Sequence, residues 1–397
     1  MEYLLSDIFE KPISGEWGKD VDKGIKGFKV IRTTNFTNLG RLNLGNIVFR
    51  DIDKEKYENK QLKFGDIIIE KSGGSLTQPV GRTVIFEVTD NEIYFCNNFT
   101  SILRPNEKVN SKYALYLMMN LYNKRKVLKY QNKTTGIINL KLSDYIRSTK
   151  VDIPNVEIQK KIAGVLDKAQ ELIDKRKEQI EALDELVKSR FIEMFGNPII
   201  NPKRWEKANI GDKFEIKSGS TPSRKEDTFW ENGTIPWVKT TELKGFVIDK
   251  TEEYITEKGF YNSSVNLLPK NTLLIAMYGQ GKTRGMTGKL GIEATTNQAC
   301  ASILPNSEEN MDFVWHQLKL LYEDLRNLGR GGNQPNLNIN LIKSYKLIFP
   351  PVELQNNFIE FVNQSNNLKF KIETNLKELE DNFNSLMQKA FKGELFN

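Results

Sequence analysis

The sequence predicts an α+β protein made by tandem duplication, in which an α/β globular unit and a long helix each occur twice. Three observations predict this fold. Five short sequence blocks recur in the same order, two long stretches have heptad spacing, and 397 residues are enough for more than one hydrophobic core.

The repeated blocks align the two halves of the chain, at offsets between about 196 and 207 residues. Each half opens with a Ser-Gly pair, Ser14-Gly15 and Ser218-Gly219. The matched pairs are FKVIRTTNF (28–36) with IPWVKTTEL (235–243), LKFGDIIIEKSGG (62–74) with LPKNTLLIAMYG (268–279), NNFTSILRP (97–105) with NQACASILP (297–305), INLKLSDY (138–145) with PNLNINLI (335–342), and IPNVEIQ (153–159) with FPPVELQ (349–355). Internal repetition of this kind predicts the architecture more strongly than any single motif.

A long helix is predicted to follow each globular unit, because apolar residues recur at alternating steps of four and three. The predicted seam of the resulting coiled coil consists of Ile162, Leu166, Ile173, Ile180, Leu183, Val187, Phe358, Val362, Ile372, Leu376, Leu379, Phe383 and Leu386. Each helix would be about 60 Å long, and the two would pair antiparallel with a globular unit at each end. The expected boundaries are 1–152, 153–196, 197–348 and 349–397.

Charge is unevenly distributed along the chain. The formal net charge is +7, yet residues 156–196 carry −1 and residues 351–397 carry −2, which leaves +10 on the globular parts. Excess basic charge there favours a polyanionic partner such as nucleic acid. The single histidine, His316, is predicted to face solvent, and two cysteines without metal-ligand spacing indicate a reducing, cytoplasmic setting. No apolar run long enough for a membrane span occurs.

The stretch AMYGQGKTRGMTG, at 276–288, invites comparison with a phosphate-binding P-loop. Ala276 occupies the place of the first glycine of that motif, and the glycines after Thr283 disfavour the helix that should follow. Its counterpart in the first half, SGGSLTQPVGR at 72–82, has no Gly-Lys-Thr. Both stretches are therefore predicted to be loops between strands, with polar tips that differ because they read different ligands.

Two other classes of function stay open from the residues alone. One is an enzyme, either a P-loop NTPase or a self-contained nuclease that uses the Glu-x-Lys of FEIK (214–217). The other is a coiled-coil adaptor that binds protein rather than DNA. The missing P-loop glycine argues against the first class, and the basic charge of the globular parts argues against the second.

The whole chain resembles the specificity subunit of type I restriction-modification enzymes. The resemblance lies in the alternation of two globular units with two heptad helices and in the motifs SGSTPSRKEDTFWENGTIPWVKTTEL, IAMYGQGKTRG, ATTNQACASILP, GGNQPNLN and the P-x-V-E-(I/L)-Q start of each helix. It implies that each globular unit is a target-recognition domain for one half of a split double-stranded DNA sequence. It also implies that the helices are a spacer and a docking surface for two modification (methyltransferase) subunits, which restriction/translocase subunits join.

The same resemblance implies a chain without catalytic activity and without a bound cofactor or metal. S-adenosylmethionine, ATP and Mg are expected on the partner subunits. Arg and Lys suit guanine, and Asn and Gln suit adenine, so polar loop residues are the candidates for DNA contact. They are Arg32, Thr33, Thr34, Ser75, Thr77, Gln78, Arg82, Lys133 and Thr134 in the first unit, and Lys239, Thr240, Thr241, Tyr278, Gln280, Lys282, Thr283, Arg284, Arg330, Asn333 and Gln334 in the second.

Overall fold

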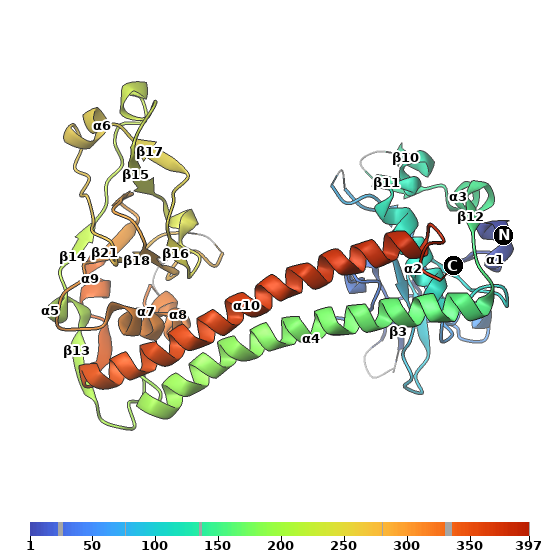
Figure 1. The fold of residues 1–397 in the computed structure, drawn as a ribbon, viewed down its shortest axis with the longest axis horizontal. Helices are drawn as coiled ribbons and strands as arrows, with labels where there is room; N and C mark the ends of the chain where they lie inside the picture. Colours follow the sequence, from blue (N-terminus) through green and yellow to red (C-terminus); the bar gives the residue numbers. More distant parts are fainter. Residues whose placement is uncertain (23–26, 76, 135–136, 280, 330–335, 397) are drawn as a thin grey trace. The chain divides into compact units, whose positions relative to one another are not determined.

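The computed structural model describes residues 1–22, 27–75, 77–134, 137–279, 281–329 and 336–396, and of Lys133 and Thr134 it describes only the backbone. The chain forms two compact units (Figure 1). Unit 1 contains residues 1–177 and 374–397, and unit 2 contains residues 178–373. Each long helix therefore contributes one half to each unit.

The described residues of unit 1 form four small sheets. Their strand orders are β2-β9-β5-β7, β4-β3-β8, β10-β11-β6 and β1-β12. The strands are β1 (Glu2–Leu4), β2 (Ile13–Ser14), β3 (Phe28–Ile31), β4 (Val48–Arg50), β5 (Ile67–Glu70), β6 (Ser72–Gly73), β7 (Thr83–Ile85), β8 (Tyr94–Cys96), β9 (Thr100–Leu103), β10 (Gln131–Thr134), β11 (Ile137–Leu140) and β12 (Lys150–Asp152). The helices are α1 (Leu5–Ile8), α2 (Ser111–Asn123), α3 (Leu142–Ser148) and the 3-10 turns η1 (Thr33–Asn35), η2 (Glu58–Lys60) and η3 (Lys126–Tyr130).

In the part of unit 2 that the structure describes there are three sheets, with strand orders β14-β21-β18-β19-β16, β17-β15-β20 and β13-β22. The strands are β13 (Glu206–Asn209), β14 (Ile216–Ser218), β15 (Ile235–Val238), β16 (Val247–Ile248), β17 (Glu253–Ile255), β18 (Leu273–Ala276), β19 (Thr287–Leu290), β20 (Thr295–Thr296), β21 (Cys300–Ile303) and β22 (Lys346–Phe349). The helices are α5 (Ile210–Lys213), α6 (Glu257–Tyr261), α7 (Met311–Leu320), α8 (Tyr322–Asn327), α9 (Ile339–Lys343) and the turns η4 (Asp227–Phe229) and η5 (Thr240–Glu242).

The two units repeat the same strand pairings, which confirms the duplication predicted from the sequence. Strand order β2-β9-β5-β7 in unit 1 recurs as β14-β21-β18-β19 in unit 2. A parallel pair, β3 with β8, recurs as β15 with β20. The antiparallel pair β1 with β12 recurs as β13 with β22. The matched sequence blocks thus fall on equivalent elements.

The Ser-Gly pairs mark a close backbone approach in both units. A Cβ atom on Gly15 would lie 2.0 Å from the Asn97 carbonyl oxygen, and one on Gly219 would lie 2.2 Å from that of Asn297. No side chain fits at either distance. The two glycines allow β2 and β14 to cross the turns that begin at Asn97 and Asn297.

The predicted long helices are α4 (Val156–Phe195) and α10 (Val352–Ala390), and they pair antiparallel within each unit. In unit 1 the Lys177 ammonium lies 2.8 Å from the Glu380 carboxylate, and in unit 2 Lys369 lies 2.7 Å from Asp184. Every predicted seam residue is buried or half-buried. Phe191 and Phe195, which the heptad pattern did not single out, are fully buried in the core of unit 2.

His316 lies on α7 in contact with the long helix, contrary to the prediction that it faces solvent. Its ring centroid is 5.7 Å from that of Phe358 on α10. The prediction was wrong because the helical pattern of α7 does not reveal that α10 covers this face. Burial, followed in importance by the Lys319 charge, lowers the pKa of His316 from 6.5 to about 4.

This low pKa makes unit 2 sensitive to acid between pH 6.5 and 4. In that window His316 is protonated in the unfolded chain but remains largely neutral in the folded chain. The free energy of unfolding therefore falls as the pH falls. At pH 5 the loss from this group is about 2 kcal/mol. Denaturant titrations followed by tryptophan fluorescence at pH 7 and pH 5 measure it. His316→Gln should have a smaller difference between the two pH values; an unchanged difference contradicts the assignment.

Candidate functional site

An open hollow of about 420 Å³ in unit 1 brings together side chains that the sequence predicted to meet DNA. Its lining includes Thr33 and Thr34 of η1 and Ser75, Gln78 and Arg82 of the loop between β6 and β7. Thr34, Ser75, Thr77 and Gln78 are exposed. The structure therefore joins two loops that lie about forty residues apart in the chain, and exposes mainly hydroxyl and amide groups there.

Arg82 is held by the protein itself. Its Nε atom donates to Glu70 Oε2 at 3.1 Å, and its Nη2 atom donates to Glu70 Oε1 at 3.3 Å and to the Thr33 carbonyl at 3.4 Å. The Glu70 side chain is only 3% exposed, so the pair is largely withdrawn from water. Because removing one partner of a buried pair is costly, Arg82 and Glu70 fix the position of η1 beside the loop.

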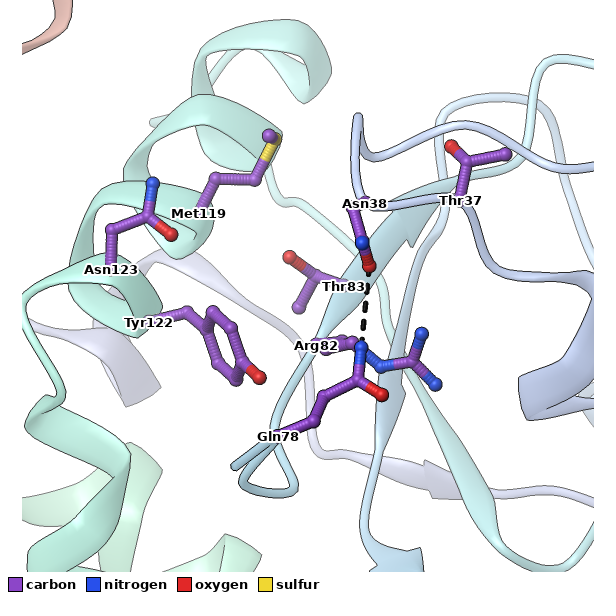
Figure 2. A pocket seen from close by; sticks show the side chains of 8 residues that line it. All are labelled: Thr37, Asn38, Gln78, Arg82, Thr83, Met119, Tyr122 and Asn123. Carbon is purple, nitrogen blue, oxygen red and sulfur yellow. Dashed lines mark hydrogen bonds between the residues drawn. The ribbon is translucent and has the colours of Figure 1, made fainter. Parts of the chain in front are cut away.

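Arg32 is also engaged within unit 1, since its Nη2 atom donates to the Asn46 carbonyl at 2.7 Å. A second hollow of about 220 Å³ shares Gln78 and Arg82 with the first and is lined by Thr37, Asn38, Gln78, Arg82, Thr83, Met119, Tyr122 and Asn123 (Figure 2). The Tyr122 hydroxyl donates to the Pro79 carbonyl at 2.9 Å, which ties the loop to α2. Gln78 thus lines both hollows.

In unit 2 the corresponding loop joins the antiparallel strands β18 and β19. Thr283 is followed by strand β19, whereas a P-loop requires a helix there, so the P-loop interpretation is not supported. Gly279, Gly281 and Gly285 have positive φ values of 141°, 60° and 80°, as a tight loop requires. Tyr278 and Lys282 are exposed, and Thr283 and Arg284 are half-buried.

This loop is anchored, as in unit 1, to the neighbouring helix. The Tyr322 hydroxyl of α8 donates to the Lys282 carbonyl at 2.6 Å, and Arg326 donates to the same hydroxyl at 2.9 Å. The Lys282 backbone is therefore fixed while its side chain extends into solvent. A fixed loop with an exposed ammonium is suited to contact an anionic ligand.

Lys239 and its neighbours in η5 differ in how available they are. The Lys239 ammonium lies 2.8 Å from Glu253 and 3.1 Å from Glu252, and these hydrogen bonds raise the pKa of Lys239. Thr240 is buried and Thr241 is exposed. Lys239, which aligns with Arg32, is thus neutralised by acids of its own unit, as Arg82 is in unit 1, and the sequence pattern did not reveal this.

Some predicted residues cannot be placed. Gln280, Arg330, Asn333 and Gln334 lie outside the described residues, and so do the side chains of Lys133 and Thr134 on β10. Conversely, Asn38 was not predicted, although it contacts Gln78. Nothing in the repeats could have found it, because the aligned position in unit 2 is Gly245.

Asn97 and Asn297 occupy equivalent turns in the two units. Their backbone N–H groups donate to the carbonyls of Ile31 and Val238, at 2.9 and 3.1 Å. Within the described parts of the chain, no cluster of three potential metal ligands exists, and no helix is both long and apolar enough to cross a membrane.

Two repeated α/β units, each presenting a polar loop beside an equivalent turn and each holding about half of both long helices, define a class of duplicated two-unit proteins. The family model for the type I restriction modification DNA specificity domain matches residues 1–183 and 202–381. The chain therefore belongs to the type I restriction-modification specificity family.

Similarity to individual relatives agrees with this assignment. The chain is 26% identical over 175 residues to the EcoR124I/EcoR124II specificity subunit of Escherichia coli, covering 43% of each chain. It is 30% identical over 162 residues to the MjaIX specificity subunit of Methanocaldococcus jannaschii, covering 39% of this chain and 36% of that one. These two matches span less than half of either relative. With the MjaX specificity subunit of the same organism, identity is 23% over 372 residues, covering 88% and 83%.

Solved structures show the same fold over almost the whole chain. The S subunit of the M. genitalium type I system superposes with a TM-score of 0.56 at 17% identity, covering 98% of this chain and 96% of that one. A chain from a type I R-M system studied for complex assembly and conformational transition gives a TM-score of 0.63 at 14% identity, covering 100% and 98%.

Proposed function

We propose that this chain is the DNA-specificity subunit of a type I restriction-modification complex and that each unit reads one half of a split double-stranded target. The observation that supports this most directly is the repeated loop, which follows equivalent strands in both units yet exposes different polar side chains. Two copies of one scaffold with different tips suit two different half-sites. The basic excess of the globular parts supplies attraction to phosphate.

In this proposal the chain is a scaffold without catalytic activity, in the cytoplasm. Target-recognition domains would occupy residues 1–152 and 197–348, and spacer helices residues 153–196 and 349–397. The paired helices would dock two modification subunits, joined by restriction subunits, and those partners would bind S-adenosylmethionine, ATP and Mg. The paired helices carry a small net negative charge and an exposed polar surface, which suits protein contact better than DNA contact.

Lys282→Ala tests the two-reader part of the proposal. We expect the variant to weaken binding by about fivefold or more, because an exposed ammonium on a fixed loop contacts phosphate or guanine. The loss should concern the half-site that unit 2 reads. Mobility shifts at two salt concentrations, on targets with single base changes in either half, show which half-site the variant affects. If Lys282→Ala alters the response to base changes equally in both halves, independent readers are excluded.

Removing one heptad from each helix tests the spacer. The register given by Lys177 with Glu380 and Asp184 with Lys369 makes residues 178–184 and 370–376 a matched pair for deletion. Seven residues correspond to about 10 Å of helix, or about three base pairs of B-DNA. We expect the tolerated gap between half-sites to shorten by that amount in a gap-length binding series. A deletion in α4 alone, which breaks the register, serves as the control, and an unchanged gap after the paired deletion refutes the spacer role.

A further inference from the structure

Gln78 is presented to solvent by a turn that is closed by its own hydrogen bonds. The Ser75 N–H donates to the Gln78 carbonyl at 2.7 Å, and the Gln78 N–H donates to Ser75 Oγ at 3.0 Å. Below the turn, Pro79 accepts the Tyr122 hydroxyl and Val80 is fully buried. The backbone of Gln78 is therefore fixed, while its side chain is exposed.

The side-chain amide of Gln78 is positioned in turn by Asn38. Gln78 Nε2 donates to Asn38 Oδ1 at 3.3 Å (Figure 2). Asn38 stands on a second closed turn, in which the Thr37 N–H donates to the Arg41 carbonyl at 2.9 Å and the Arg41 N–H donates to Thr37 Oγ1 at 3.1 Å. Arg41 also forms an ion pair with Asp174 of α4. Two fixed turns thus hold the two amides against each other.

The hydrogen-bonding groups left on Gln78 match one base edge. After one N–H is given to Asn38, the amide keeps its Oε1 acceptor and a second N–H donor. In the major groove adenine offers the complementary pair, the N6 amino donor and the N7 acceptor, whereas guanine offers two acceptors. A glutamine amide can bond adenine through both groups, and cannot do so with guanine.

The charged side chain at this surface also favours adenine over guanine as the base that is read. Arg82 is the cation that lines both hollows beside Gln78, and its Nε and Nη2 donors are directed to Glu70 and Thr33. Reading guanine would require a free pair of donors from such a side chain. Among the described residues of the two hollows, the exposed groups are the hydroxyls of Thr34 and Ser75 and the amides of Gln78 and Asn38, with the Asn123 amide at the rim.

We propose that Gln78 reads an adenine in the half-site recognised by unit 1, and that Asn38 is a positioning residue that orients the Gln78 amide for this contact. The inference rests on the proposed function, because it assumes that unit 1 binds DNA. It goes beyond that function by assigning one base to one side chain and by adding a residue that the sequence did not indicate.

The test is to map methylated sites in cells that carry the chain with its partner subunits. In Gln78→Arg, one adenine position of one half-site is expected to change to guanine, because arginine presents two donors. In Gln78→Ala, the preference for adenine at that position should fall by about tenfold or more. The other half-site should stay the same in both variants, while Lys282→Ala affects that other half only.

Asn38 is tested by a matched pair of variants. Asn38→Asp keeps an oxygen that accepts from Gln78 and should keep the adenine preference, whereas Asn38→Leu removes the acceptor and should relax it at the same position. Melting temperatures of the purified variants establish that each is folded.

The outcomes separate the two levels of the proposal. If Lys282→Ala alters its own half-site while Gln78→Arg leaves the target unchanged, or alters a position that is not adenine, the Gln78 assignment is overturned. A uniform loss of methylation in Gln78→Ala without any change in base preference also overturns it. If variants in neither unit change a split target, the proposed function itself fails.

Discussion

Replacing Phe358 with alanine is expected to lower the free energy of unfolding of unit 2 by about 3–5 kcal/mol, the usual cost of removing a buried phenyl ring. Phe358 is completely buried. Its ring centroid lies 5.4 Å from that of Phe191, 5.8 Å from that of Phe195 and 6.3 Å from that of Phe313. The ring therefore joins α10, α4 and α7, and its loss leaves a cavity at the point where all three helices meet.

Tryptophan fluorescence measures this loss selectively. Of the five tryptophans, only Trp17 belongs to unit 1, so the signal in a denaturant titration reports mainly on unit 2. Phe246→Ala is the matched control, because Phe246 is 71% exposed and its truncation should change stability by no more than about 0.5 kcal/mol. A cost for Phe358→Ala as small as that of the control would show that the aromatic cluster does not hold the helices to α7.

The duplication and the long helices could be predicted from the sequence because both leave periodic traces. Repeated blocks place equivalent strands, and the heptad pattern depends only on local spacing. Other features have no such trace. Sheet β10-β11-β6 has no counterpart among the described strands of unit 2. Conversely, strand β16 extends the largest sheet of unit 2, and no described strand occupies the equivalent place in unit 1. Phe191 and Phe195 are buried by α7 and α10, which approach from distant parts of the sequence.

The candidate site was predictable to the level of loops and no further. Alignment of the halves identified the loops at 72–82 and 276–288 and the turns that begin at Thr33 and Thr240. It could not show that Arg82 is paired with Glu70, or Lys239 with Glu252 and Glu253, because these contacts depend on tertiary packing. Arg82 and Lys239 are therefore engaged within their own units, although their residue types alone suggested contact with DNA.

A buried glutamine anchors the start of each long helix, and it explains why the helix-start motif ends in Gln. Gln355 accepts from the Asn310 N–H at 3.1 Å and donates to the Pro350 carbonyl at 2.8 Å and to Glu309 at 2.7 Å. Gln159 makes the equivalent bonds in unit 1, to the Asn110 N–H and to the Pro154 and Lys108 carbonyls. Asn110 and Asn310 are the N-caps of α2 and α7, so each glutamine joins a long helix to a helix of its unit.

Replacing either glutamine with leucine is expected to lower the free energy of unfolding of its unit by about 3 kcal/mol or more, because buried partners of the amide lose their hydrogen bonds. Glutamate should be worse than leucine at pH 7, since its carboxylate would face carbonyl oxygens that need donors. Gln364→Leu, at an exposed position of α10, is the matched control.

Hydrogen exchange at the amides of α2 and α7 reports the two units separately. Because Gln159 and Gln355 share no partner, the losses should add in the double variant, and each single variant should accelerate exchange in its own unit. Faster exchange in α2 after Gln355→Leu would mean that the first turn of α10 supports both units. Exchange unchanged in α7 would mean that the glutamine bonds contribute little. We expect each single variant to lose protection from exchange only in its own unit, because the two duplicated units have separate hydrophobic cores.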